Sequence, residues 1–198
     1  MLVGKVSIPA ADLPGLIAYA RTQGDLLSYG SVGVGSGGHL GMELLKSLTG
    51  IKAVHIPFPS NPQVATAIIA GDIDLSLAIP SIVMPLAKNG RLRIYGVSTA
   101  SRAAAFSDVP SIAQSLKLPG FDVEGWNAIF APASMSEAIA ARLSQEISRI
   151  LRSPEIRQRL FDQGWQTLGT APEGLSRKIK NDTTLWASVI KTTGARAE

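Results

Sequence analysis

A glycine-rich stretch between an apolar run and a helix-like run constrains the fold of this chain more than any other feature. Residues 29–39 read Y-G-S-V-G-V-G-S-G-G-H and contain five glycines and two serines. A strand-like run, 26–29, leads into this stretch, and a helix-like run, 40–48, follows it. Glycine permits positive φ and close approach of the backbone to a ligand. A helix that starts at such a loop offers free N–H groups and its positive dipole end. We therefore expect a small acidic ligand, a carboxylate, to bind at this turn.

Strand-like and helix-like segments alternate with short turns over the first hundred residues. This alternation predicts an α/β fold, in which a parallel or mixed sheet carries helices on both faces. Apolar residues at three- and four-residue spacing indicate the helices, and short apolar runs closed by glycine or proline indicate the strands. The expected helices are 9–22, 38–48, 63–70 and 79–88, and the expected strands are 26–29, 53–58, 73–78 and 92–98.

The composition changes after an irregular segment that ends near Gly125. We place a soft boundary there, which divides the chain into residues 1–125 and residues 126–198. A short helix at 111–116 precedes the boundary, and a strand-like run that contains Trp126 crosses it. The segments expected beyond the irregular region are a strand at 121–131, helices at 137–151, 154–163 and 172–191, and a short strand at 166–168.

Composition excludes several classes of site. The chain has no cysteine and only two histidines, His39 and His55, so disulfides, thiolate metal sites and histidine-rich metal clusters are excluded. The formal charge of +4 is spread along the chain, and the arginines of the C-terminal helices alternate with acids. This pattern indicates a salt-bridged solvent face and no nucleic-acid partner. We expect no metal and no cofactor.

Two features bear on the location of the protein. The sequence has no uninterrupted apolar stretch long enough to span a membrane. The first residues, 1–5, do not show the basic start, apolar middle and cleavage site of a signal peptide. A chain expressed as written is therefore expected in the cytoplasm.

The glycine loop also matches other patterns in part. Gly33-x-Gly35-x-x-Gly38 fits a dinucleotide fingerprint, but residues 56–60, where the ribose-binding acid should lie, contain no acid. The P-loop pattern fails because no Lys-Ser or Lys-Thr follows the glycines. A tight structural turn without a ligand is a further alternative, although five glycines exceed what a turn needs.

A hydrolytic reading is weaker still. Ser36 and His39 could be a nucleophile and its base, but G-x-S-x-G is absent and no nearby acid is placed to orient His39. His55, at a strand end, is interpreted as a structural histidine. Asp72 and Asp74 are interpreted as a solvated strand edge and a turn.

A series of motifs in constant order resembles the Bug-type, TctC-like substrate-binding proteins of tripartite tricarboxylate transporters. The series covers essentially the whole chain. Its members are L-I-A-Y-A-R at 16–21, the glycine stretch at 29–40, H-I-P-F at 55–58, A-G-D-I-D at 70–74, N-G-R-L-R at 89–93, S-T-A-S-R at 98–102, D-V-P-S at 108–111, L-P-G-F at 118–121 and W-N-A-I-F-A-P-A at 126–133.

The resemblance implies a type II periplasmic binding-protein fold whose two lobes close on a small carboxylate. It also implies a membrane permease as partner, a periplasmic location and no enzymatic activity. Residues 1–125 would form the second lobe with the glycine-loop anion site, and residues 126–198 would form the C-terminal helical part of the first lobe. The ligand-binding residues that the resemblance carries over are Ser31, Gly33, Gly35, Ser36 and His39. Gly38, Ala78 and Ile79 are predicted as further ligand-binding residues.

Three departures from the family pattern alter these expectations. Family members begin with a signal peptide and roughly a further third of the mature chain, so this chain is expected to be N-terminally truncated and to lack a complete cleft. Ala78 stands where the family often has an aspartate, which argues against an amino-acid ligand. Pro59-Ser60 replaces a frequent lysine–glycine pair. The alternative is a truncated relative that binds no solute and acts as an oligomerising or interaction module, for example as a homodimer.

Overall fold

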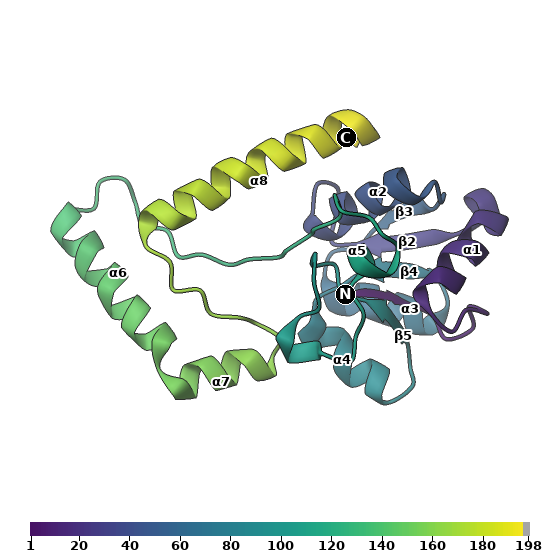
Figure 1. The fold of residues 1–198 in the computed structure, drawn as a ribbon, viewed down its shortest axis with the longest axis horizontal. Helices are drawn as coiled ribbons and strands as arrows, with labels where there is room; N and C mark the ends of the chain where they lie inside the picture. Colours follow the sequence, from purple (N-terminus) through teal and green to yellow (C-terminus); the bar gives the residue numbers. More distant parts are fainter. Residues whose placement is uncertain (196–198) are drawn as a thin grey trace. The chain divides into compact units, whose positions relative to one another are not determined.

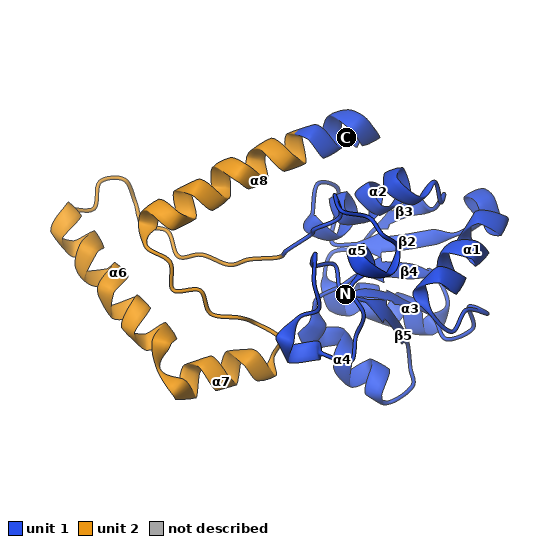
Figure 2. Cartoon of the chain, viewed as in Figure 1, with its two compact units in different colours: residues 1–124, 188–198 blue, residues 125–187 orange. Residues whose placement is uncertain are grey.

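The computed structural model describes residues 1–195 and divides the chain into two compact units (Figure 2). The first comprises Met1–Glu124 together with the segment that starts at Ser188, and the second comprises Gly125–Ala187. The assignment of 1–125 and 126–198 to two lobes of a binding protein stays a prediction.

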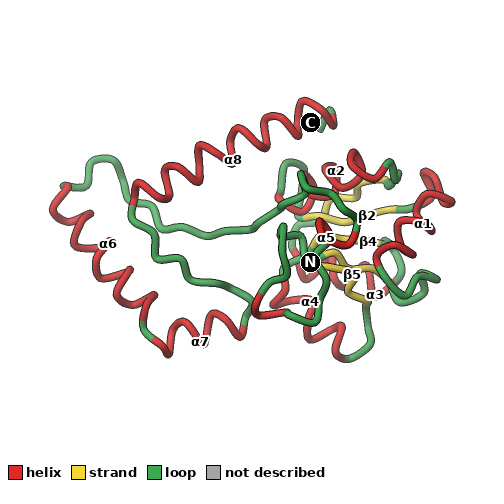
Figure 3. Tube along the Cα trace, viewed as in Figure 1, coloured by secondary structure: helices red, strands yellow, loops and turns green. Residues whose placement is uncertain are grey.

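The first unit is built on a five-stranded mixed sheet with the order β3-β2-β4-β1-β5 (Figures 1 and 3). β2 pairs in parallel with both β3 and β4, whereas β1 pairs antiparallel with β4 and β5. The predicted α/β class with a mixed sheet is confirmed. The strands are β1 (Leu2–Gly4), β2 (Ser28–Ser31), β3 (Val54–Pro57), β4 (Leu75–Leu77) and β5 (Arg93–Gly96).

The helices of this unit follow the predicted order. Some boundaries differ: α1 starts after Asp12, whose side chain accepts the Gly15 N–H at 2.8 Å, and not at residue 9. A 3-10 turn, η1, covers Gly24–Leu26, so β2 lies two residues later than predicted and contains Ser31. The elements are α1 (Leu13–Gln23), α2 (Gly37–Thr49), α3 (Asn61–Ala70), α4 (Pro80–Lys88), a second 3-10 turn, η2 (Ala104–Phe106), and α5 (Ile112–Ser115).

The chain changes direction across the sheet at β2. It passes from β2 through α2 to β3 on one side, and then from β3 through α3 back across β2 to β4. Because crossovers between parallel strands are right-handed, these opposite steps place α2 and α3 on opposite faces of the sheet. The contacts agree, since α3 packs on α4 while α2 packs on β2 and β4. The connections after β2 and β4 therefore diverge at the carboxyl edge of the sheet.

β1 was not predicted, although it occupies the space between β4 and β5. Its three residues are too few to show a period, and they pair antiparallel with both neighbours. Its signal in the sequence is the apolar run Met1-Leu2-Val3, whose side chains are all buried. The parallel strands β4 and β5 are thus separated by a short antiparallel strand.

The second unit contains α6 (Glu137–Arg152), α7 (Pro154–Asp162) and most of α8 (Pro172–Thr193). The predicted helices are confirmed, and so is the salt-bridged face, since Glu146 pairs with Arg142 at 3.1 Å and with Arg149 at 2.9 Å. Trp126 donates its indole N–H to Asp182 at 2.7 Å.

The two strands predicted at 121–131 and 166–168 are wrong. Val123 donates its N–H to the Ser98 carbonyl at 2.8 Å, but no named strand includes either segment in the described part of the chain. Phe121 and Val123 are buried, but the later apolar residues of these segments reach solvent, with Ile129 71%, Phe130 68% and Leu168 71% exposed. An alternating pattern forms a strand only where a partner strand supplies hydrogen bonds.

Asp74 is buried, which corrects the prediction that it lies at a solvated edge or turn. The residue is 8% exposed, and its carboxylate accepts hydrogen bonds from the Ser28 N–H at 2.7 Å and the Ser28 hydroxyl at 3.0 Å. The Lys5 ammonium lies 2.6 Å from its other oxygen. One carboxylate therefore joins the start of β2, the start of β4 and the residue after β1. Asp72 is exposed, as predicted.

Replacing Asp74 with alanine should destabilise the sheet. Asp74→Ala leaves the Ser28 amide and Lys5 without their partner, so we expect the free energy of unfolding to fall by about 2–4 kcal/mol. Urea denaturation monitored by circular dichroism measures the change. Asp72→Ala, two residues away and exposed, is the matched control and should change stability by less than about 0.5 kcal/mol. Equal effects of the two substitutions would contradict the tie described for Asp74.

Candidate functional site

The glycine loop connects the carboxyl end of β2 with the start of α2. β2 ends at Ser31 and α2 begins at Gly37, after the N-cap Ser36. Gly33 has φ +116° and Gly35 has φ +79°, a region that side chains rarely adopt, so glycine is required at both positions. Val32 and Val34 point into solvent, with 39% and 40% of their surface exposed.

The two serine hydroxyls hold the loop internally. Ser36 Oγ donates to the Gly33 carbonyl at 2.7 Å and accepts the His39 N–H at 3.3 Å, as an N-cap does. Ser31 Oγ lies 3.2 Å from Ser36 Oγ and accepts the Gly33 N–H at 3.3 Å. Ser31 is buried. The hydroxyls predicted as donors to a ligand are therefore engaged within the loop in this structure.

Gly38 brings the first turn of α2 against the end of β4. A Cβ atom at Gly38 would lie 3.0 Å from the Leu77 carbonyl oxygen, a backbone atom that cannot rotate away. This contact places the loop beside Ala78 and Ile79, the residues between β4 and α4. Both are half-buried, and Ile79 is the N-cap residue of α4. The first turn of α2 and the residues that follow β4 therefore lie at the edge where the connections after β2 and β4 diverge, which is where open α/β sheets bind ligands.

Two histidines and Tyr29 form a cluster of stacked rings beside the loop. His39, in the first turn of α2, and His55, on β3, have ring centroids 4.2 Å apart. Both rings also stack on the buried Tyr29, with centroids 6.3 Å and 5.0 Å away. His39 Nδ1 accepts the Gly35 N–H at 3.2 Å, and His55 Nε2 lies 2.7 Å from Ser31 Oγ. Sequence reasoning missed His55 as a site residue, because only the pairing of β2 with β3 brings it to Ser31.

Both imidazoles are neutral near pH 7. Burial, followed by the neighbouring His39, lowers the pKa of His55 to about 4. Burial also lowers the pKa of His39, and the nearby Glu43 opposes that shift only in part. Since an N–H group can only donate, Nδ1 of His39 is the unprotonated nitrogen, and the ring proton is on Nε2.

The ion pair of Glu43 and Lys46 adjoins Tyr29. Glu43 accepts hydrogen bonds from the Tyr29 hydroxyl and from Lys46, whose ammonium is 2.6 Å away. Burial works against ionisation of Glu43, but these two donors outweigh it and hold the pKa of Glu43 below its ordinary value. Burial and the Glu43 carboxylate together raise the pKa of Tyr29. The acid four residues after His39 was not recognised in the sequence as part of this cluster.

The loop leaves backbone donors available. Within the described residues 1–195, the amides of Gly37 and Gly38, in the first turn of α2, have no hydrogen-bond partner. Free amides at a helix start and the positive end of the dipole suit a carboxylate. The two neutral histidines bring no negative charge that would repel it.

The arrangement does not support the hydrolytic reading. The His39 ring bonds the Gly35 amide, and the recorded contact between His39 and Ser36 runs through the His39 backbone N–H. The serine within reach of an imidazole is Ser31, which is buried. Ser36 is an N-cap residue, so its predicted role as a nucleophile finds no partner geometry here.

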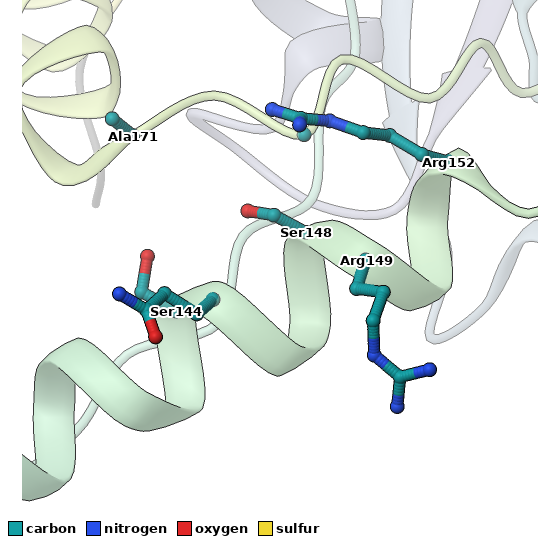
Figure 4. Close-up of a pocket in the computed structure, with 7 residues that line it drawn as sticks. Ser144, Ser148, Arg149, Arg152 and Ala171 are labelled. Atoms are coloured by element: carbon teal, nitrogen blue, oxygen red, sulfur yellow. The ribbon is translucent and has the colours of Figure 1, made fainter.

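A separate hollow of about 410 Å³ lies in the second unit (Figure 4). Figure 4 shows Ser144, Ser148, Arg149 and Arg152 on α6, opposite the segment that carries Ala171. Arg149 is paired with Glu146 at 2.9 Å, and both arginines are largely exposed. The surface of the hollow is charged, but none of the polar residues that line it is buried. We therefore assign the candidate site to the glycine loop.

The described residues offer neither a metal site nor a membrane-spanning helix. Residues 1–195 contain no group of three or more His, Cys, Asp or Glu side chains able to hold a metal ion. Among the helices of the described region, none is both long and apolar enough to cross a bilayer.

Adding a methyl group at Gly38 should disturb the site, whereas the same change one residue earlier should not. Gly38→Ala places Cβ against the Leu77 carbonyl, so α2 must shift, and we expect about 1–3 kcal/mol of destabilisation. Gly37 has open space around it and a helical conformation, so Gly37→Ala should be neutral or stabilising by up to about 1 kcal/mol. Thermal or urea denaturation of both variants measures the difference, and a neutral Gly38→Ala would contradict the close approach.

The histidine stack should make the protein less stable in acid. The folded chain keeps His55 neutral down to about pH 4, whereas the unfolded chain protonates it below about pH 6.5. The unfolded state therefore binds more protons in this window, and the free energy of unfolding should fall as the pH drops from 6.5 to 4. Urea denaturation at several pH values should show a shallower fall for His55→Gln. Parallel curves for the variant and the parent would rule out His55 as a source of the effect.

Comparison with known proteins identifies the family of this chain. A family model described as "Tripartite tricarboxylate transporter family receptor" matches residues 1–195. A Pseudomonas sp. (strain P51) protein, "UPF0065 protein in tcbD-tcbE intergenic region", is 30% identical over 179 residues, which is 90% of this chain and 53% of that protein. This chain therefore spans about half the length of that relative.

Solved structures share the fold. "R. palustris Rpa4515 with adipate" matches with a TM-score of 0.92 and 28% identity over 98% of this chain and 64% of that one. "MatC (Rpa3494) from Rhodopseudomonas palustris with bound malate" matches with a TM-score of 0.85 and 27% identity, over 96% of this chain and 65% of that one. The periplasmic binding protein BugD matches with 0.88 at 22% identity, over 100% and 66%, and shows the fold alone. The fold is thus that of periplasmic binding proteins, and the chain belongs to the tripartite tricarboxylate transporter receptor family.

Proposed function

We propose that this chain takes part in capturing a small carboxylate for a tripartite tricarboxylate-type transporter, without enzymatic activity. The observation that carries the proposal is the pair of free amides, Gly37 and Gly38, at the carboxyl edge between β2 and β4. The family is one of transporter receptors, which supports a binding role rather than a catalytic one. Two solved relatives, each more than a quarter identical to this chain, carry adipate and malate.

The carboxylate would bind at the first turn of α2. One oxygen would accept the Gly37 N–H and the other the Gly38 N–H, and both bonds would be charge-assisted. The positive dipole end of α2 adds to this attraction, and the nearest acid, Glu43, is already paired with Lys46 and Tyr29. Ala78 and Ile79 would contact the ligand body, and Ala78 offers no charge to an amino group.

The facing wall of the binding cleft would come from outside these residues. This chain matches 64% and 65% of the two ligand-bound relatives, so roughly a third of each lies beyond the match. We propose that such a segment faces the glycine loop and that the two sides close over the ligand by a hinge movement. A membrane permease as recipient and a periplasmic location follow from the family and belong to the same proposal.

A second candidate function is an interaction module that binds no solute. The second unit favours it, because no residue of the amphipathic helices α6 and α7 is buried. Ile129, Phe130 and Leu168 add exposed apolar surface. Such a face is covered in a stable protein by another segment or another chain, and a second copy of this chain would make a homodimer.

A proline at the first helical position tests the carboxylate site. Gly37→Pro removes one proposed donor, while proline suits this position and Ser36, with φ −65° and ψ 157°, is already extended as a residue before proline must be. Thermal unfolding against mono-, di- and tricarboxylates should show a shift for the parent chain, because a ligand of the folded state stabilises it. Gly37→Pro should bind about tenfold more weakly, whereas Gly37→Ala keeps the amide and should bind as the parent does.

Light scattering in the same samples separates the two functions. A shift with at least one carboxylate that Gly37→Pro reduces supports solute capture. A folded dimer with no shift for any carboxylate would refute solute binding by this chain and support the interaction module.

A further inference from the structure

The two histidines hold opposite ends of the glycine loop. His55 reaches from β3 to Ser31, the last residue of β2, and His39 reaches back from α2 to the amide of Gly35, near the other end. Their rings are in contact, with centroids 4.2 Å apart. The loop is thus tied at both ends to one pair of stacked rings.

Such a tie matters because the loop is rich in glycine. Glycine loses more backbone freedom on folding than any other residue, so an unrestrained loop with Gly33 and Gly35 at positive φ would sample many conformations. A ligand that bound a mobile loop would have to order it, and affinity would fall accordingly. The Gly35 bond also directs that amide toward His39, so the Gly35 amide is not among the open donors, whereas those of Gly37 and Gly38 are.

We infer that His39 and His55 are positioning residues that pre-order the glycine loop for a carboxylate, acting through Gly35 and Ser31 and not by contact with the ligand. This inference rests on the proposed function for its binding arm only. Tyr29, stacked under both rings and tied to Glu43, provides the rigid support on which the pair rests.

A crossed pair of substitutions tests the inference. The side-chain amide of asparagine lies where Nδ1 of histidine lies, and that of glutamine lies where Nε2 lies. His39→Asn should therefore keep the acceptor for Gly35, and His39→Gln should lose it. The reverse holds at the other position, where His55→Gln should keep the contact with Ser31 and His55→Asn should lose it.

The start of α2 should survive the loss at position 39. The N-cap bond at this position runs from the backbone N–H of residue 39 to Ser36 Oγ, and the Ser36 N–H already donates to the Gly33 carbonyl at 3.2 Å, so neither bond depends on the imidazole. A change in His39→Gln therefore reports on the loop and not on fraying of the helix.

Two measurements read the outcome. Amide hydrogen exchange by NMR should show Gly35 protected in the parent and in His39→Asn, and about tenfold less protected in His39→Gln. Adipate titration by calorimetry should show about tenfold weaker binding for His39→Gln and His55→Asn, and near-parent binding for the other two variants.

The outcomes are distinguishable. If the parent fails to bind adipate but the exchange pattern follows the crossed order, the positioning role stands and adipate capture fails. If the parent binds adipate and Asn and Gln behave alike at each position, the positioning role is overturned and solute capture stands. If a variant at one histidine fails to fold, the Asn and Gln variants at the other histidine still test the positioning role.

Discussion

The start of α2 lies against the carboxyl end of β4, and the whole candidate site depends on this backbone contact. The absence of a side chain at Gly38 allows it, because the Leu77 carbonyl occupies the space that a Cβ would need. Without this approach the start of α2 would not lie at the end of β4. The contact also aligns the helix start with the edge where the connections of the sheet diverge, so the dipole and the free amides face the same place.

Behind this contact, charges and rings maintain the geometry. Asp74 fixes the amino ends of β2 and β4 to each other through Ser28 and to the end of β1 through Lys5. At the opposite end of β2, Ser31 lies 2.7 Å from the His55 ring, which stacks on Tyr29. The strand that carries the loop is therefore held at its start by a carboxylate and near its end by stacked rings, while its middle is fixed by two parallel neighbours.

Much of this could be predicted from the sequence, and the exceptions have physical causes. Local periodicity and glycine stops identify the helices of both units and the parallel strands, because those signals are local. β1 escaped because three residues carry no period, and its role depends on pairing with residues more than seventy positions away. The strands predicted at 121–131 and 166–168 failed for the opposite reason: a local pattern was present, but a partner strand was not. The candidate site divides in the same way. The glycine loop, Ser36 and His39 adjoin one another in the sequence, whereas strand pairing brings His55 to Ser31 and a helical turn brings Glu43 to Tyr29.

The two exposed valines of the loop, Val32 and Val34, have a consequence for how such a site diversifies. The proposed grip on the acid group uses backbone amides, which nearly every residue has, while the valine side chains point away from the internal hydrogen bonds of the loop. If the loop binds a carboxylate as proposed, substitution at these two positions would alter the exposed surface of the loop without altering the groups that hold the charge. One scaffold could in this way vary the surface around its acid site by single mutations while its fold remains constant.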